Sequence, residues 1–193
     1  MIDFKSYVDS IHSYLNKMQV TDCNRQVIDQ EEGLTKWCDL TANVKQLNST
    51  MYFVGNGASA MMASHMAADA TKNGGLRSLA FNDAALMTAI SNDVAYEDCF
   101  SMPLERFAVS GSVFVSISSS GNSPNIVKAI LTAKKMGLDV VTLSGMNPDN
   151  RSRQMGDLNF YIPADTYGLV EVTHQAILHC WLDKYIESRF KSE

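Results

Sequence analysis

Apolar residues in the first quarter of the chain recur with the spacing of a helix. Over residues 4–20 and 24–47 they fall at intervals of three and four positions, as Tyr7, Ile11 and Leu15 illustrate. This spacing is typical of amphipathic helices, whose apolar stripe must be buried against another element. Two such helices before any strand predict a helical layer or a contact between subunits.

After residue 48 the pattern changes to short apolar runs that alternate with helical stretches. The runs are rich in β-branched residues and bounded by Gly, Asn, Asp or Ser, which is typical of buried parallel strands: Met51–Val54, Ser78–Phe81, Val113–Ile117, Val140–Leu143 and Phe160–Ile162. Helices are expected between them, at 59–73, 84–92, 95–108, 124–136, 150–155 and 167–190.

This alternation predicts an α/β fold, a three-layer α/β/α sandwich around a five-stranded parallel sheet with right-handed crossovers. The sequence contains no internal repeat and no Pro/Gly-rich linker. We therefore expect a single domain over 1–193, with an N-terminal helical layer at 1–48 and an α/β core at 49–193.

Composition and charge restrict the possible partners. The 193 residues are 46% hydrophobic and 19% charged, with a net charge of -5 and no basic run. A nucleic-acid surface would need clustered Lys and Arg, so we expect no nucleic-acid partner. An anionic ligand would have to be held by hydroxyls and backbone dipoles.

The N-terminus and the cysteines indicate the compartment. The segment MIDFKSYVDSIHSYL lacks a basic region followed by an apolar run, so it does not resemble a signal peptide. No apolar stretch approaches the length of a membrane span. The four cysteines form no CxxC pair and are expected to be reduced. A cytoplasmic protein with no membrane partner is the expectation.

A serine-rich loop, Ser118–Ser123, follows the predicted strand Val113–Ile117. Pro124 suits the first turn of a helix, which makes Ser123 its expected N-cap. A helix N-terminus offers free N–H groups and a partial positive charge, and serine hydroxyls add donors. The loop therefore predicts a phosphate site, although a polar loop that only caps a helix has the same composition.

A second loop, Gly55–Ser59, follows the strand Met51–Val54. Its glycines permit close backbone approach to a ligand, and Ser59 is expected to cap the next helix. It lacks the GxGxxG pattern, so no nucleotide cofactor is expected. A purely structural turn stays an alternative. Asp93, in a third polar segment, indicates little by itself.

Two polar stripes could carry chemistry. His65 and Asp69 lie at i, i+4 on one predicted helix, and Glu171, Gln175 and His179 lie at i, i+4, i+8 on the last one. Imidazoles and carboxylates on two helices could serve as an acid/base pair or as ligands of a divalent metal. Solvated carboxylates and satisfied core histidines are the alternative for each residue taken alone.

Five segments together resemble a known family: GNGAS, HMAAD, ISND, SISSSGNSPN and EVTHQAILH, in this order. They are similar to the sugar isomerase (SIS) domain, in its phosphoheptose isomerase branch, and the resemblance spans nearly the whole chain. It implies a flavodoxin-like fold and conversion of sedoheptulose 7-phosphate to a heptose 7-phosphate in heptose biosynthesis. It also implies a homotetramer with shared active sites and, in some members, zinc.

The resemblance also implies roles for individual residues. Those that would bind the sugar phosphate are Asn56, Gly57, Ser59, Asp93, Ser118, Ser119, Ser120 and Ser123. Asp69 and His179 would be the acid/base pair of an aldose–ketose isomerisation through a cis-enediol. Glu171 and His65 would orient that pair or complete, with it, a metal site.

This chain departs from the family in ways that bear on function. The family usually has Glu at position 69 and Gln at position 171, and its arginine after the first acid is replaced in the region of Lys72 and Asn73. These changes favour an altered substrate. Other readings are a non-catalytic SIS protein that binds a sugar phosphate or a protein, a pentose or hexose phosphate isomerase, and a regulatory sugar sensor. The presence of Asp69 favours an enzyme.

Overall fold

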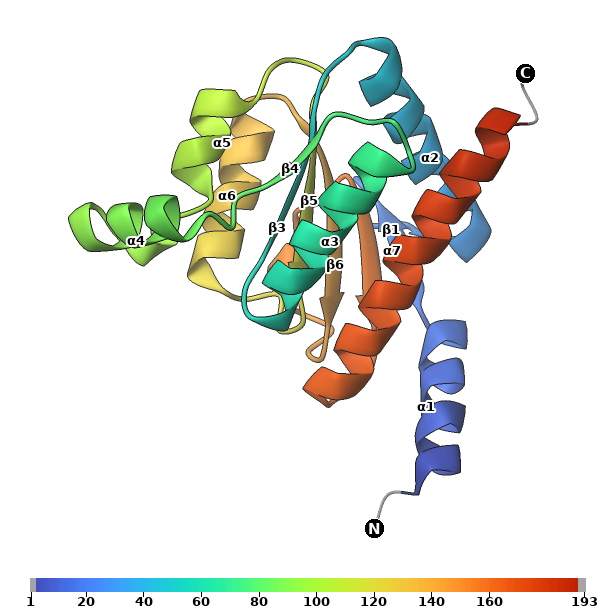
Figure 1. Cartoon of the computed structure of the whole chain (residues 1–193). Helices are drawn as coiled ribbons and strands as arrows, with labels where there is room; N and C mark the ends of the chain where they lie inside the picture. The colour runs from blue at the N-terminus through green and yellow to red at the C-terminus, as the bar shows by residue number, and fades with distance from the viewer. Residues whose placement is uncertain (1–2, 191–193) are drawn as a thin grey trace.

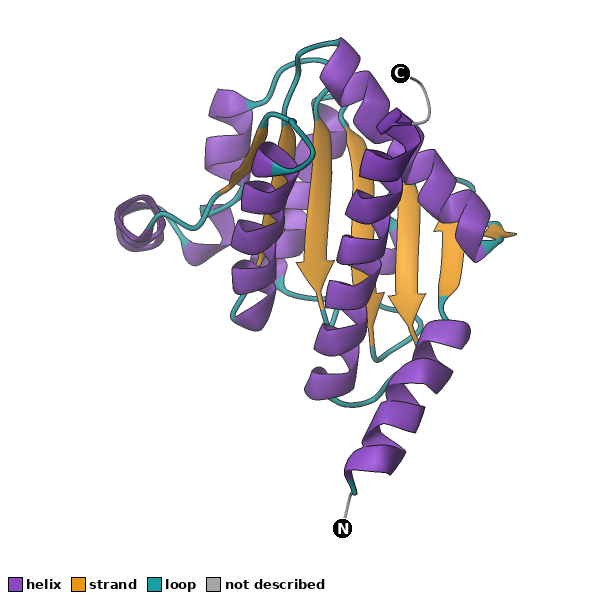
Figure 2. Ribbon diagram, turned by 45° about the vertical axis from the view of Figure 1, so that its right-hand side comes forward, coloured by secondary structure: helices purple, strands orange, loops and turns teal. Residues whose placement is uncertain are grey.

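The computed structural model describes residues 3–190, which fold into three layers around one sheet (Figures 1 and 2). The strand order is β2-β1-β7-β6-β5-β3-β4. Strands β3 to β7 are parallel, and β1 pairs antiparallel with both β7 and β2. The strands are β1 (Gln19–Asp22), β2 (Val27–Ile28), β3 (Met51–Gly55), β4 (Ser78–Ala80), β5 (Val113–Ser118), β6 (Asp139–Gly145) and β7 (Leu158–Ile162).

Helices cover both faces of the sheet, as the alternating pattern predicts. α2, α3 and α7 pack on one face and α5 and α6 on the other, while α1 and α4 project from the body (Figures 1 and 2). The helices are α1 (Phe4–Asn16), α2 (Gln30–Gln46), α3 (Ala58–Lys72), α4 (Ala84–Asp93), η1 (Tyr96–Asp98), α5 (Ser101–Phe107), α6 (Pro124–Lys135), η2 (Ser152–Gln154) and α7 (Tyr167–Phe190).

The sheet has two more strands than the sequence predicts, so the five-stranded expectation is wrong in number. The apolar spacing predicted a first helix that extends to position 20. In the structure α1 ends at Asn16, and β1 begins at Gln19. Val20 is fully buried and pairs with Phe160 of β7. In the sequence, the alternation of a four-residue strand is too short to be distinguished from the last turn of an amphipathic helix.

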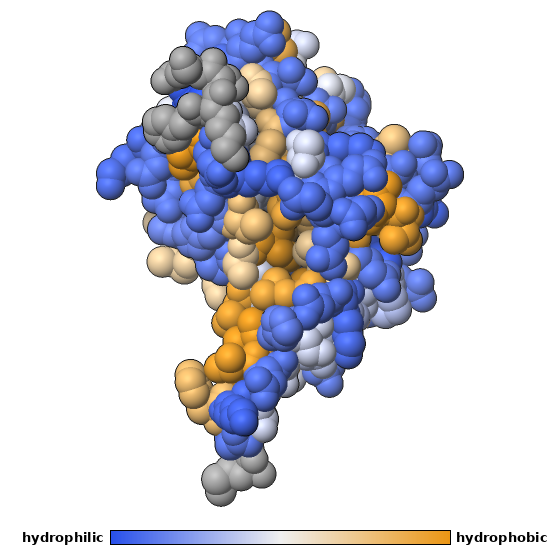
Figure 3. All heavy atoms as spheres, turned by 90° about the vertical axis from the view of Figure 1, so that its right-hand side faces the viewer, coloured by the Kyte–Doolittle hydropathy of each residue, from blue (hydrophilic) through white to orange (hydrophobic). Residues whose placement is uncertain are grey.

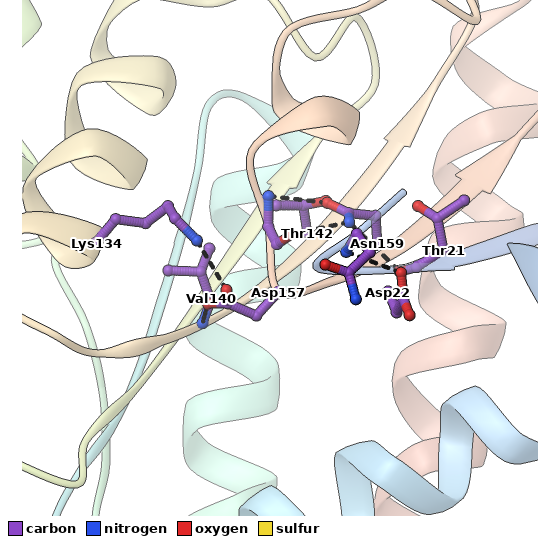
Figure 4. A network of polar contacts seen from close by, with 9 residues as sticks. Thr21, Asp22, Lys134, Val140, Thr142, Asp157 and Asn159 are labelled. Carbon is purple, nitrogen blue, oxygen red and sulfur yellow. Dashed lines mark hydrogen bonds and ion pairs between the residues drawn. The ribbon is translucent and has the colours of Figure 1, made fainter. Parts of the chain in front are cut away.

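The antiparallel edge is joined to the parallel strands by buried polar groups (Figure 4). Asn159 Oδ1 accepts from Thr142 Oγ1 at 2.8 Å, and Asn159 Nδ2 donates to the Thr21 carbonyl at 3.4 Å. Nearby, Asp157 Oδ2 accepts from the Val140 backbone N–H at 3.0 Å. These side chains satisfy buried groups where β1 meets β7 and β6, and so fix the register of the added strand.

Stacked aromatic rings link α2 to α7 and the sheet. The rings of Trp37 and Trp181 stack with centroids 4.5 Å apart, and Trp37 also contacts Phe160 at 5.3 Å. Trp181 Nε1 donates to Thr41 Oγ1 at 3.0 Å, which satisfies a buried donor. The second N-terminal helix is therefore part of the main core.

Within residues 3–190 no helix is long and apolar enough to cross a membrane.

His174, for which the sequence offers no polar partner, is a packing residue of α7. It is completely buried, and its Nε2 lies 3.1 Å from the Ser144 carbonyl oxygen. A carbonyl can only accept, so Nε2 carries a proton. Burial lowers the pKa of His174 to about 4.

This buried imidazole makes stability depend on pH. The unfolded chain, in which a histidine titrates near pH 6.5, takes up the proton first as the pH falls. The stabilisation is therefore complete above about pH 6.5 and is lost as the pH falls toward 4. Urea unfolding should show a loss of about 2 kcal/mol between pH 7.5 and 5 that is absent in His174→Gln.

The exposed His12 provides the control for this measurement. His12→Gln removes an imidazole from the surface instead of from the core. Equal slopes for the wild type and His174→Gln would contradict the assignment.

Candidate functional site

A cavity of about 250 Å³ lies at the carboxyl ends of β3 and β5, where ligands bind in open parallel sheets. Two loops and the first turns of α7 meet there. Its walls are formed by Asn56, Gly57, Ala58, Ser59, Ile117, Ser118, Ser119, Ser120, Ser123, Tyr167 and Glu171. The structure thus brings the two predicted loops to one place. No Lys or Arg is among these lining residues.

The two helices that begin at the cavity lack side-chain caps. Neither the N-cap residue of α3, Gly57, nor that of α6, Ser123, makes a side-chain cap bond. In α6 the N–H of Ile126 donates instead to Asn125 Oδ1 at 3.0 Å. In α1, α2 and α4 the carboxylates of Asp3, Asp29 and Asp83 fill this role. In α3 the N–H groups of Ser59 and Ala60 donate to the Asn56 and Gly57 carbonyls, both at 3.0 Å. What both helices offer an anion in the cavity is therefore mainly the partial positive charge of their N-terminal ends.

The serines lie differently from the prediction in one respect. Ser59, expected as an N-cap, is the second residue of α3, and the N-cap is Gly57 with φ 58°. Glycine adopts this backbone conformation without the steric cost that a side chain brings, so the N-cap lies two residues closer to the strand than expected. Ser123 is the N-cap of α6, as predicted. Ser119 Oγ is buried and has no hydrogen-bond partner within residues 3–190, so a ligand oxygen would satisfy it.

The serine loop is held from behind by the segment that follows β6. Ser152 N donates to the Gly121 carbonyl at 2.9 Å, and Arg151 N donates to Asn122 Oδ1 at 3.0 Å. Asn150 is fully buried against Gly121. The sequence pattern gave no signal for this support, because a single Asn in a loop has no periodicity or motif.

Three of the predicted titratable residues form a cluster on α3 and α7. His65 Nε2 lies 3.3 Å from Asp69 Oδ2, and the rings of His65 and His179 are 5.2 Å apart at 64°. One ligand atom from each of the three residues lies within 4.8 Å of the others. Two imidazoles and one carboxylate make a donor set that suits zinc, with a fourth position left for water or a ligand.

Glu171 lies apart from this cluster. It is one of the residues that line the cavity, and it precedes His179 by two helical turns, about 12 Å along α7. Gln175, between them, donates from Nε2 to Met66 Sδ of α3 at 3.5 Å. The i, i+8 stripe therefore extends from the cavity to the cluster along one face of α7.

Asp93 is not among the residues that line the cavity. It is the last residue of α4, it is exposed, and its Oδ1 accepts from Asn92 Nδ2 at 2.7 Å. Tyr96, three residues later, contacts a lining residue from outside the cavity, since its hydroxyl lies 2.9 Å from Asn56 Oδ1. The sequence analysis did not select Tyr96, because an isolated tyrosine after a helix carries no motif.

The close packing of Gly121 generates a prediction. Its φ is 64°, and a Cβ there would lie 2.0 Å from Asn150 Oδ1. Gly121→Ala should therefore lower the unfolding free energy by about 2 kcal/mol more than positive φ alone would, as in other overpacked sites. Gly137→Ala, with φ 73° and nothing within 4 Å, is the matched control. Equal losses in urea unfolding would show that Asn150 does not constrain the loop.

Comparisons with known proteins agree with this architecture. Residues 13–145 match the SIS domain family. The chain is 33% identical to a phosphoheptose isomerase of Sulfurimonas denitrificans, over 83% of each protein, and 32% identical to that of Fusobacterium nucleatum, over 88% of this chain and 89% of the relative.

Solved structures show the same fold. The phosphoheptose isomerase of Neisseria gonorrhoeae has a TM-score of 0.79 at 24% identity, covering 93% of this chain and 94% of that one. That of Francisella tularensis has a TM-score of 0.81 at 20% identity, covering 96% and 94%. The fold, the matched domain and the sequence relatives agree, and the chain belongs to the SIS domain family, in its phosphoheptose isomerase branch.

Proposed function

We propose that this protein is a phosphoheptose isomerase that interconverts sedoheptulose 7-phosphate and its aldose isomer. Relatives at 32–33% identity carry that name. The observation that carries the proposal is the pairing of a cavity built for an oxyanion with a cluster of two imidazoles and a carboxylate on the same two helices.

The spacing of cavity and cluster favours a long sugar. Along α3, Ser59 at the cavity precedes His65 by about 9 Å. Along α7, Glu171 precedes His179 by about 12 Å. An extended seven-carbon sugar with its phosphate in the cavity covers this length and brings C1 and C2 to the cluster. A pentose phosphate is shorter, so the spacing favours a heptose over the smaller sugars.

The phosphate would be held by neutral donors. The cavity is lined by Ser118, Ser119, Ser120 and Ser123, whose hydroxyls can donate, and α3 and α6 begin beside it with the partial positive charge of their N-terminal ends. Ser59, Gly57 and Asn56 add donors from the other loop. Glu171 would accept from sugar hydroxyls, because a carboxylate in this cavity repels the phosphate itself. Contact of Asp93 with the sugar is a weaker part of the proposal, since Asp93 does not line the cavity.

Asp69 and His179 would move the protons. In the proposed reaction the Asp69 carboxylate takes the C1 proton of the ketose while His179 donates a proton to O2, which gives a cis-enediol. Return of the carbon proton to C2, with loss of the O1 proton to His179, gives the aldose. His65, 3.3 Å from Asp69, would orient the carboxylate.

The same cluster would hold zinc through His65, Asp69 and His179. A bound zinc ion supplies Lewis acidity that polarises the carbonyl. Glu171 is an unsuitable fourth ligand within one chain, because it lies about two helical turns from His179.

The surface of α1 supports a proposal of self-association into the homotetramer. None of its residues is buried, and Phe4 and Val8 are 82% and 45% exposed. Figure 3 shows apolar side chains gathered on this projecting part of the molecule. An amphipathic helix that exposes its apolar stripe is stabilised by burial against a second copy. All four cysteines are free thiols, which supports a cytoplasmic location.

Replacement of the proposed base is the direct test of function. Asp69→Asn should lower kcat about 10³-fold, because general base catalysis is lost, and leave inorganic phosphate binding within about twofold, because the cavity is unchanged. NMR in D₂O with C5 to C7 sugar phosphates would follow isomerisation and deuterium uptake, with chelator-treated and zinc-supplemented protein in parallel.

Glu105→Gln is the control for this test. Glu105 is an exposed carboxylate on α5, which packs on the opposite face of the sheet from α3 and α7, so its loss changes charge away from the cluster. Full activity of Asp69→Asn would show that another group takes the proton. Absence of turnover on every sugar in the wild type would favour a non-catalytic sugar-phosphate binder.

The proposed assembly has its own test. Val8→Glu places a charge in the exposed stripe and should shift the protein to a smaller species in light scattering coupled to gel filtration. Leu131→Glu is the control, since Leu131 is an apolar side chain of α6, 53% exposed and remote from α1. An unchanged mass for Val8→Glu would remove α1 from the interface.

A further inference from the structure

The side chain of Asn56 is enclosed by hydrogen bonds at the edge of the cavity. It forms a reciprocal pair with Asn125 of α6: Asn56 Nδ2 lies 2.9 Å from Asn125 Oδ1, and Asn125 Nδ2 lies 2.9 Å from Asn56 Oδ1. The hydroxyl of Tyr96, from η1, lies 2.9 Å from Asn56 Oδ1. Two separate elements, α6 and η1, therefore converge on one amide.

The orientation of both amides follows from a backbone group. The N–H of Ile126 lies 3.0 Å from the Asn125 side chain, and a backbone N–H can only donate. The atom that it meets is therefore Asn125 Oδ1, so Asn125 Nδ2 faces Asn56 and Cys99 Sγ. Asn56 must then present Oδ1 to that donor, and Tyr96 must donate its hydroxyl proton.

This arrangement uses up the acceptor capacity of Asn56. Oδ1 accepts from Asn125 and from Tyr96, which occupies both of its lone pairs. Nδ2 gives one proton to Asn125 and retains a second N–H, for which the described part of the chain contains no partner. Asn56 can therefore only donate to a ligand.

We propose that Tyr96 and Asn125 are positioning residues that hold Asn56 as a dedicated donor to a phosphate oxygen of the bound sugar. The inference deepens the proposed function and rests on the phosphate binding in this cavity. No Lys or Arg lines the cavity, so phosphate binding depends on neutral donors that are held in a fixed orientation. An amide that was free to rotate would present its oxygen to the anion half of the time. Tyr96 prevents this by donating to the oxygen from outside the cavity.

Removal of one hydroxyl tests the idea. Tyr96→Phe should weaken inorganic phosphate binding, measured by ³¹P NMR titration, about three- to tenfold, which is a partial loss of one charged hydrogen bond. KM for sedoheptulose 7-phosphate should rise by the same factor while kcat changes less than twofold. Tyr52→Phe is the control, because the Tyr52 hydroxyl also makes one bond, to the Phe107 carbonyl at 2.7 Å, away from the cavity.

A double-mutant cycle shows whether Tyr96 acts through Asn56. In an Asn56→Ala background Tyr96→Phe should have no further effect on phosphate binding, because the amide that it positions is gone. Equal effects in both backgrounds, or no effect in the wild type, would overturn the proposal. Melting temperatures identify a variant that is only destabilised, and Asn56→Ser replaces Asn56→Ala if the latter does not fold.

The outcomes separate this inference from the proposed function. Phosphate binding with the expected coupling but no turnover of any sugar would leave the positioning role in place and overturn the isomerase assignment. Turnover without coupling between Tyr96 and Asn56 would leave the isomerase assignment in place and overturn the positioning role. A wild type that does not bind inorganic phosphate would overturn both.

Discussion

The site depends on two helices, α3 and α6, that start at the same cavity without a side-chain cap from their N-cap residues. α3 and α6 lack the side-chain caps that Asp3, Asp29 and Asp83 give to α1, α2 and α4. A protein with a net charge of -5 can hold an anion in this way without any lysine or arginine, because the donors are fixed by the fold and not by long flexible side chains. The serine hydroxyls, the amide of Asn56 and the segment behind Gly121 all serve this one arrangement.

The strands that form this site were readable from the sequence, and the edge of the sheet was not. Four of the five parallel strands, β3, β5, β6 and β7, are fully buried or nearly so, and continuous apolar runs between turn residues predict such strands well. β1 and β2 have four and two residues, and strands this short have no distinct period. Their place is fixed by tertiary contacts such as Val20 with Phe160, which no local pattern contains.

The same division applies to the site. The serine loop and the pair of His65 and Asp69 were predictable, because a loop between strand and helix and an i, i+4 pair are local signals. The sequence grouped both Glu171 and His179 with this pair, and the fold brings only His179 to it. The location of Glu171 at the cavity follows from the direction of α7, and the roles of Asn150 and Tyr96 follow from contacts between distant segments. Those relations exist only after the chain has folded, so sequence spacing could not give them.

The sheet ends on its two shortest strands, β2 with two residues and β4 with three. Edge strands this short leave few main-chain groups free to pair with a strand of another copy, which disfavours polymerisation into fibres. Growth of the assembly by extension of the sheet is thereby discouraged, and only its helical surfaces are left for contact between copies. The short edge strands therefore favour oligomers with a fixed number of copies over open-ended polymers.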